Sequence, residues 1–308
     1  MTPRLKTALA TRGHTEALKQ GTVRPRTFEF DFEEVPVIVK AFRRMVRHLD
    51  FDICELAMTT YLCSRAHAKP FTAIPVFPMR AFHHGAIVYD TKAGIRTPKD
   101  LEGRKVGVNR GYTVTTGLWV RSILQHEHGV DLRRVTWVLS GDEHVAEYRP
   151  PPNVVSVEPG TTLEELLKAG EIAAAIGVQV ESPDVRPLIP DATEAGLEAL
   201  RQRGLYPINH TVVVRNDLLE ANPELAPDIF NAFAEAKRIY VERLEAGRVD
   251  GADPVHLKVR ELIGDPLPYG IEPNRQNLEA IVQYSVEQGI LARPFALEEL
   301  FPPNTLRL

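Results

Sequence analysis

Apolar and polar residues alternate with two different periods in the first part of the chain. Short stretches with an apolar residue at every second position, or with clustered β-branched and aromatic residues, predict strands at 5–10, 28–32, 51–57 and 71–76. Helices are predicted between these strands, at 11–21, 35–48 and 58–66. In the second of these helices, Val35, Val39, Phe42 and Val46 recur at the spacing of one helix face. Strands that alternate with helices are typical of a mostly parallel sheet.

A second set of alternating elements follows Tyr89. The same patterns predict strands at 106–109, 135–139, 172–177 and 185–190, and helices at 111–128 and 162–170. Thr162 and Glu165 have the spacing of a capping box at the start of the second helix. The middle of the chain therefore predicts another α/β unit.

The last part of the chain begins with a β-branched strand and is otherwise helical. The strand is predicted at 211–215, and the helices at 223–246, 255–263 and 274–288. We therefore expect an α/β fold with two lobes, in which mostly parallel sheets are flanked by helices. One lobe would contain residues 1–89 and 208–308 and the other residues 90–207, with two crossovers and a ligand cleft between the lobes.

Composition and charge narrow the class of protein. The chain has 308 residues, is 44% hydrophobic and 25% charged, and has a formal net charge of -4. This balance is typical of a globular protein, and the absence of a long run of one charge argues against nucleic-acid or membrane partners. No apolar run approaches the roughly 18 residues that span a bilayer. The first residues lack the apolar segment of a secretory signal, so we expect a cytoplasmic protein. The sequence is also compatible with a homo-oligomer.

Two cysteines, Cys54 and Cys63, are expected to be buried, reduced thiols. Their spacing is neither that of a zinc site nor that of a disulfide framework.

The stretch 77–89 carries the most distinctive candidate chemistry. It places an arginine and two histidines ahead of an apolar run. If the stretch is extended, Arg80, Phe82 and His84 share one face and His83 lies on the other, because strand side chains alternate. Arginine binds carboxylates through a rigid fork, and histidine titrates near neutral pH. The grouping is suited to an anionic aromatic substrate.

A second candidate is an anion site at the start of the helix predicted at 111–128. The strand 106–109, the Gly111 turn and the helix start would leave backbone N–H groups free. Tyr112, Thr113 and Thr115 lie at that helix start. The glycines do not form a dinucleotide-binding fingerprint.

Three further candidate side chains lie at the ends of predicted strands or at the second crossover. Glu55 lies at the carboxyl end of a strand, where ligands of open α/β sheets bind, and His14 follows the first strand. His210 lies at the second crossover, opposite the first. No cofactor is expected. A divalent metal held by Glu55, His84 and His210 stays open, although no pair of these residues has a diagnostic spacing.

Several blocks of the sequence, in order along nearly the whole chain, resemble one family. They are Phe51 to Glu55, Pro75 to His84, Gly111 to Thr115 and Tyr206 to Thr211. The resemblance is to the 4,5-dihydroxyphthalate decarboxylases. It implies the type II periplasmic-binding-protein fold, adapted to an intracellular enzyme that converts 4,5-dihydroxyphthalate to protocatechuate and CO2. The family's first strand usually ends in a Tyr-Asp-Arg-Thr sequence, whereas this chain has 12–15 as Arg-Gly-His-Thr, which leaves the ring substitution of the substrate open.

The resemblance also implies roles for the candidate residues. The reaction needs an acid above a ring carbon, a base at a hydroxyl and a cation on the second carboxylate. We expect Arg80 to hold that carboxylate and the helix start to make a second anion contact. His84 would be the acid, Glu55 the base, and His210 a substrate ligand or acid–base partner. His83 and His14 are further substrate contacts, and each of these residues has a purely structural role as its alternative.

Other functions fit the sequence less well. One is a non-catalytic binding protein or sensor for a small aromatic or carboxylate ligand. Another is the related synthase of the thiamine pyrimidine precursor, whose family carries a cysteine cluster that two isolated cysteines do not supply. A hydrolase is poorly supported because no G-x-S-x-G nucleophile elbow is present.

Overall fold

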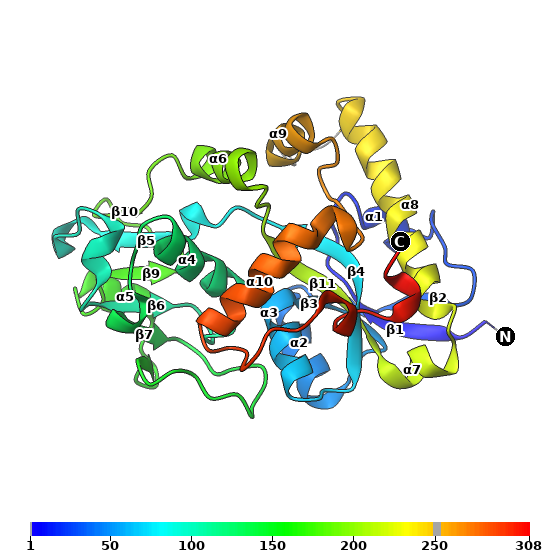
Figure 1. The fold of residues 1–308 in the computed structure, drawn as a ribbon, viewed down its shortest axis with the longest axis horizontal. Coiled ribbons are helices and arrows are strands. Elements are labelled where there is room, and N and C mark those ends of the chain that lie inside the picture. The colour runs from blue at the N-terminus through cyan, green and yellow to red at the C-terminus, as the bar shows by residue number, and fades with distance from the viewer. Residues whose placement is uncertain (1, 249–253) are drawn as a thin grey trace. The chain divides into compact units, whose positions relative to one another are not determined.

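The computed structural model describes residues 2–248 and 254–308. The described chain forms two compact units, each built from a sheet and flanking helices, and Figure 1 shows both. The first unit contains residues 1–80, 208–279 and 295–308, and the second contains residues 81–207 and 280–294. The predicted division differs at two places, because residues 81–89 and 280–294 pack in the second unit.

Five strands form the sheet of the first unit, in the order β2-β1-β3-β11-β4. Their bounds are β1 (Arg4–Ala8), β2 (Glu29–Phe32), β3 (Ile53–Ala57), β4 (Phe71–Arg80) and β11 (Ile208–Arg215). β1, β2 and β3 are parallel, and β11 is antiparallel to both of its neighbours, β3 and β4. The carboxyl ends of β1, β3 and β4 therefore meet the amino end of β11 at one edge of the sheet, which we call the carboxyl edge.

Helices cover both faces of this sheet. The helices of the first unit are α1 (Glu16–Lys19), α2 (Val39–His48), α3 (Met58–Ala66), α7 (Asn216–Ala221), α8 (Leu225–Glu245) and α9 (Pro254–Ile263). Ile53, Val212 and Val214 pack in one core with residues of α1 and α8. Cys54 and Val213 alternate with them, point to the other face and are fully buried. β3 and β11 are buried along nearly their whole length, so neither of their faces meets water, whereas β2 at the side of the sheet is partly exposed.

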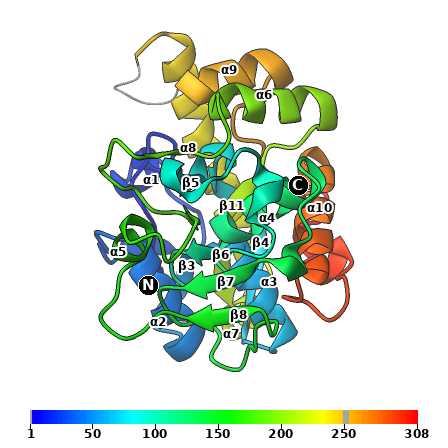
Figure 2. The same ribbon diagram turned by 90° about the vertical axis from the view of Figure 1, so that its left-hand side faces the viewer.

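Six strands form the sheet of the second unit, in the order β10-β5-β9-β6-β7-β8. Their bounds are β5 (Ile87–Asp90), β6 (Lys105–Val108), β7 (Thr136–Leu139), β8 (Val154–Ser156), β9 (Ala174–Ile176) and β10 (Val185–Pro187). Its helices are α4 (Thr115–His126), α5 (Leu163–Lys168), α6 (Ala192–Arg203) and α10 (Arg275–Glu287), the last of which begins in the first unit. Figure 2 shows the parallel strands β7 and β8 side by side.

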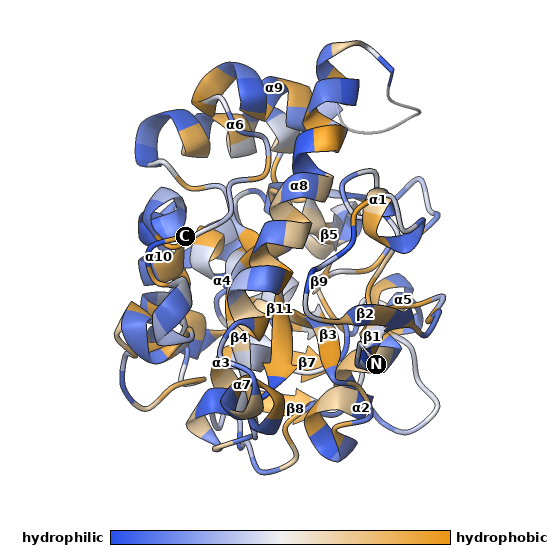
Figure 3. Ribbon diagram, turned by 90° about the vertical axis from the view of Figure 1, so that its right-hand side faces the viewer, coloured by the Kyte–Doolittle hydropathy of each residue, from blue (hydrophilic) through white to orange (hydrophobic). Residues whose placement is uncertain are grey.

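The hydropathy of the elements explains which of them the sequence predicts well. In Figure 3, the strand β11 is mostly hydrophobic, whereas α8 carries hydrophobic and hydrophilic residues in alternation. The helix predicted at 58–66 has the same bounds as α3. α6 was not predicted, because its buried side rests on small residues such as Gly196 and Ala199 beside Leu197 and Leu200.

No helix in the described part of the chain is long and apolar enough to cross a bilayer.

The stretch 77–89 is not extended throughout, so the predicted shared face is wrong beyond Arg80. β4 ends at Arg80, and His84 begins a 3-10 turn over His84–Ala86. The backbone N–H of Ala86 donates to the carbonyl of His83 at 3.0 Å, a bond that closes the turn and that an extended strand does not make. Arg80 thus ends the first unit's share of this stretch, while His84 belongs to the second unit.

Both cysteines behave as predicted. Cys54 in β3 and Cys63 in α3 are buried free thiols. Burial is the main cause that raises the pKa of the Cys54 thiol, so the protonated form is favoured.

Candidate functional site

Glu55 and His210 form a buried pair at the carboxyl edge of the first unit. Glu55 of β3 lies opposite Val212 of β11, and His210 lies opposite Ala57, so the two side chains are diagonal neighbours on adjacent strands. The Nδ1–H of His210 donates to Oε1 of Glu55 at 2.5 Å. A carboxylate only accepts, which places the proton on Nδ1 and leaves Nε2 as the second functional nitrogen.

The loop after β1 completes the surroundings of Glu55. Arg12 donates from Nη1 to Oε2 at 2.9 Å and from Nη2 to Oε1 at 2.6 Å. The backbone N–H of Ala10 adds a bond to Oε2 at 3.0 Å. Burial by itself raises the pKa of Glu55, but the charge of Arg12 and the hydrogen bonds from His210 and Arg12 outweigh it and hold the pKa well below its usual range. Glu55 is therefore a fixed negative charge.

This bonding argues against Glu55 as a base that touches substrate. Its side chain has an exposed fraction of 0%, and both oxygens already accept two hydrogen bonds. The geometry instead favours a positioning role, in which Glu55 orients the imidazole of His210. His210 itself has a side chain that is 10% exposed, and Phe42 packs edge-on against its ring at 5.1 Å between centroids. The imidazole is thus held by Glu55 and Phe42 and keeps a small exposed surface.

His14 lies near this pair but its ring is tied to the backbone. Its Nε2–H donates to the carbonyl of Pro78 in β4 at 2.9 Å. Burial first, and then the nearby charge of Arg12, lower the pKa of His14 to about 4. The ring is therefore neutral at pH 7, and its predicted contact with substrate stays a prediction.

Arg80 ends β4 at the same edge and is buried, with 7% of its surface exposed. Its Nη2 donates to the carbonyl of Pro268 at 3.2 Å and to the side-chain oxygen of Asn274. Asn274 in turn donates to the carbonyls of Pro268 at 3.0 Å and Gly270 at 2.7 Å. The segment 267–274 thus fixes this guanidinium group, and its predicted role as a carboxylate clamp stays a prediction.

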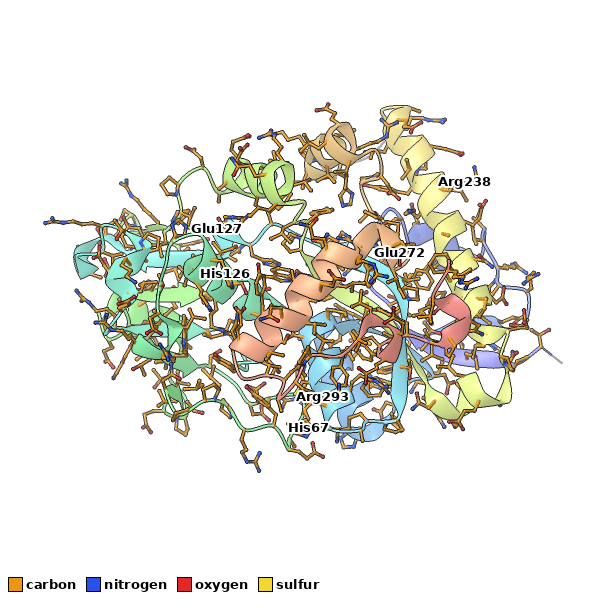
Figure 4. All side chains as sticks on the ribbon, in the orientation of Figure 1. His67, His126, Glu127, Arg238, Glu272 and Arg293 are labelled. Atoms are coloured by element: carbon orange, nitrogen blue, oxygen red, sulfur yellow. The ribbon has the colours of Figure 1, made fainter. Side chains whose placement is uncertain are left out.

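A second histidine–carboxylate pair lies in the second unit. His84 donates from Nε2 to Glu127 at 3.0 Å, and Arg203 also donates to that carboxylate. Figure 4 shows Glu127 beside His126 at the end of α4. The remaining nitrogen of His84, Nδ1, is buried and has no hydrogen-bond partner among the described residues. His83, the neighbouring candidate, is also buried, at 3% exposure.

The predicted anion site at the start of α4 is filled by a carboxylate of the chain itself. Glu143 accepts hydrogen bonds from the backbone N–H of Tyr112, from the N–H of Thr113 at 3.1 Å and from the Thr113 hydroxyl at 2.6 Å. Tyr112, Thr113 and Thr115 are all buried. The turn does bind an anion, as expected from N–H groups that have no carbonyl partner within the helix. A substrate would have to displace Glu143 to use the same donors.

A divalent metal held by Glu55, His84 and His210 stays a prediction. Within residues 2–248 and 254–308, no group of three or more His, Cys, Asp or Glu side chains is arranged to hold a metal ion. Of the three predicted ligands, Glu55 and His210 belong to the first unit and His84 to the second.

Among the cavities of the described residues, two that lie apart from the Glu55–His210 pair bear on ligand binding. One, of about 540 Å³, is lined by Thr72 at the start of β4 and Asn216 after β11, which places it at the opposite edge of the first sheet. The other, of about 20 Å³, is lined by His84, Phe82 and Trp119 in the second unit. The second has room for about one water molecule and not for an aromatic acid.

Sequence reasoning missed three of the side chains that define these sites. Arg12 could have been found by the rule that selected Glu55, because it follows the carboxyl end of a predicted strand. Glu127 and Glu143 carried no comparable signal. One ends a helix and the other lies in a loop, and only folding brings them to His84 and to the Gly111 turn.

Known proteins provide an independent comparison. No family model matches the chain. The chain is 32% identical to a 4,5-dihydroxyphthalate decarboxylase of Comamonas testosteroni over 285 residues, which cover 86% of each protein. It is 38% identical to a 4,5-dihydroxyphthalate decarboxylase of Pseudomonas putida over 149 residues, which cover 46% of this chain and 57% of that protein.

Solved structures confirm the fold. The periplasmic aliphatic sulphonate binding protein SsuA of Escherichia coli aligns with a TM-score of 0.55 at 12% identity over 99% of both chains. The alkanesulfonate-binding protein SsuA of Xanthomonas axonopodis pv. citri gives a TM-score of 0.52 at 13% identity over 94% of both chains. The desulfurization enzyme DSZB gives 0.55 at 15% identity over 99% of this chain and 97% of that one. The predicted periplasmic-binding-protein fold, with its two α/β sheets, is therefore present.

Proposed function

The chain belongs to the 4,5-dihydroxyphthalate decarboxylase family, and from this premise we propose that it is a carboxy-lyase for a dihydroxylated aromatic dicarboxylate. The substrate we propose is 4,5-dihydroxyphthalate, which would lose one carboxyl group as CO2 to give protocatechuate. The observation that carries the proposal is the His210–Glu55–Arg12 arrangement, an oriented imidazole next to a permanently charged carboxylate.

The chemistry of the reaction explains why such an imidazole is needed. Direct loss of CO2 would leave an aryl anion, so protonation of the ring carbon that bears the carboxylate comes first. The new C–H bond takes its electrons from the ring, helped by the hydroxyl group para to that carbon. The C–C bond then breaks, its electron pair restores the aromatic ring, and CO2 leaves. The net reaction consumes one proton and transfers no electrons to or from an external partner.

His210 is the group that we assign to proton delivery. Because Nδ1 donates to Glu55, Nε2 is the nitrogen that carries a proton toward a ligand. The carboxylate of Glu55 orients the imidazole, and Arg12 keeps that carboxylate ionised. General acid catalysis by a positioned side chain accelerates a reaction roughly 10²–10⁴-fold. Arg80, a buried cation at the same edge, is our candidate for binding a substrate carboxylate.

The test is CO2 release from 4,5-dihydroxyphthalate by the purified chain after treatment with a chelator. We expect turnover without added metal, with protocatechuate formed in equal amount. The His210→Asn variant is the matched control, because an Asn amide can still donate to Glu55 but cannot deliver a proton as imidazolium does. It should bind the substrate and release little CO2.

Three other results would change the proposal. Turnover that appears only after a divalent metal is added would replace proton delivery by His210 with metal chemistry. Tight binding without turnover would favour a binding protein or sensor for an aromatic acid. Neither binding nor turnover would show that the Arg12 to Thr15 segment, where the chain departs from its family, has moved the specificity elsewhere.

A further inference from the structure

Tyr269 carries a polar group that the first unit leaves without a partner. Its side chain is buried, with 6% of the residue exposed, and its hydroxyl oxygen makes no hydrogen bond within the described chain. A buried hydroxyl in this state costs free energy, so a native structure that retains one usually has a use for it. Tyr61, which is fully buried in the same unit, shows the ordinary state, because its hydroxyl donates to the carbonyl of Leu300.

The position of Tyr269 is fixed by the segment that also fixes Arg80. On one side of it, the carbonyl of Pro268 accepts a hydrogen bond from Arg80 at 3.2 Å. On the other side, the N–H of Gly270 donates to the carbonyl of Pro75 in β4 at 2.8 Å. Gly270 has a φ of +85°, and a Cβ there would lie 2.5 Å from the carbonyl oxygen of Leu308, so the turn requires glycine. The backbone of Tyr269 is therefore held against β4.

The ring of Tyr269 is also fixed. It packs in the core that α8 forms with the first sheet, and Nζ of Lys237 lies 4.7 Å from its centroid. Lys237 is held in turn by Asp265 at 2.6 Å and by the carbonyl of Leu267 at 3.1 Å. Because the backbone and the ring are both constrained, the hydroxyl oxygen stays at one position and cannot move to another partner.

The charged groups that act on the hydroxyl include three residues of the candidate site. Arg12, Arg80 and Glu55 all lie close enough to act on it electrostatically, together with Asp265. Burial is the largest cause that raises the pKa of Tyr269 above its ordinary value, so the group stays a neutral O–H donor at every physiological pH. Two guanidinium groups and two carboxylates thus act on the hydroxyl, and as a neutral donor it can form a hydrogen bond to an anionic oxygen atom.

We propose that the Tyr269 hydroxyl is a substrate-binding group that donates a hydrogen bond to a carboxylate oxygen of the aromatic ligand, beside Arg12 and Arg80. The inference rests on the proposed function for the identity of the substrate. It adds a specificity determinant at the carboxyl edge, because the hydroxyl favours a ligand that brings an acceptor to this position. A ligand without one leaves the hydroxyl unpaired.

The test compares Tyr269→Phe with Tyr61→Phe in the full chain. For each variant, affinities for 4,5-dihydroxyphthalate, phthalate and catechol are measured by calorimetry, and stability by urea unfolding. Tyr269→Phe should weaken binding of both dicarboxylates roughly 10- to 100-fold, the range for a hydrogen bond to a charged group, and leave catechol unaffected. It should not lower the urea midpoint, since no internal bond is lost. Tyr61→Phe should lower the midpoint and leave the three affinities unchanged.

Each contrary outcome overturns the inference. Unchanged dicarboxylate affinity in Tyr269→Phe, or a drop in the urea midpoint like that of Tyr61→Phe, would show that the hydroxyl is structural. Weaker binding of catechol as well would show that the hydroxyl is not specific for a carboxylate. A wild-type chain that binds neither dicarboxylate would also overturn it. If the wild type binds them through Tyr269 but releases no CO2, the decarboxylase proposal fails while this inference stands.

Discussion

Each unit of the molecule holds one buried histidine against a glutamate, and the two pairs differ in which ring nitrogen remains. In the first unit, Nδ1 of His210 donates to Glu55, which leaves Nε2 on a side chain that is 10% exposed. In the second unit, Nε2 of His84 donates to Glu127, which leaves Nδ1 buried. The same two residue types therefore present opposite nitrogens with different access.

The carboxylates differ as well. Glu55 has a side-chain exposure of 0% and is bound by Arg12 through both of its oxygens. Glu127 is 21% exposed and also binds Arg203. A carboxylate buried with a guanidinium partner cannot easily take up a proton, so it remains a constant orienting charge. The comparison shows that a buried His–Glu pair is not catalytic merely because it contains these two residues. The free nitrogen and the fixed charge decide what the pair can do.

The largest expected effect is on turnover. His210→Asn and His84→Gln are matched variants, because each amide reproduces the donor that the histidine gives to its glutamate. We expect kcat to fall roughly 10²–10⁴-fold for His210→Asn and less than about 10-fold for His84→Gln. Initial rates of CO2 release at saturating substrate measure both. The reverse order would restore His84 as the general acid, the role expected for it from the sequence.

The next effect is on stability. Glu55→Gln leaves the Arg12 guanidinium without its counter-charge, and breaking one side of a buried pair costs about 3–5 kcal/mol. Glu127→Gln changes a partly exposed carboxylate, for which about 1 kcal/mol or less is expected. Urea unfolding at pH 7 separates the two. Equal losses would mean that the buried position of Glu55 carries no special weight.

The smallest effect concerns pH and uses His14, whose Nε2 bonds a carbonyl instead of a carboxylate. Its pKa is about 4 in the folded chain against an ordinary value of 6.5, so the unfolded state binds the proton more readily. The contribution to stability is therefore complete above pH 6.5 and is lost as the pH falls toward 4, by about 3 kcal/mol in all. His14→Gln keeps a donor for Pro78 and should flatten the stability profile in this window. A profile unchanged by the substitution would contradict the assignment of His14 as a buried neutral ring.

Much of the fold follows from local pattern. The strands β1, β3 and β11 and the helices α2, α3 and α8 lie where apolar periodicity predicts them, because that periodicity reflects the side that each element buries. The sequence predicted Glu55 at the carboxyl end of a strand and His210 at the second crossover, and the structure has both at the carboxyl edge of the first sheet. The family was identified from short blocks and is confirmed by the relative from Comamonas testosteroni.

The bonding of the site depended on tertiary structure. His210 meets Glu55 across 155 positions of sequence, and His84 meets Glu127 across 43, distances at which no local pattern specifies a partner. The sequence did not indicate that Glu143 would fill the helix start at Gly111. It also did not indicate that the extended stretch that contains Phe77 would end at Arg80. The amino-acid order thus determined which elements form and which chemical groups they carry, because those depend on neighbours along the chain. Only packing decided which carboxylate each histidine meets and which nitrogen it leaves for a ligand, because those contacts exist only once the strands and loops have come together.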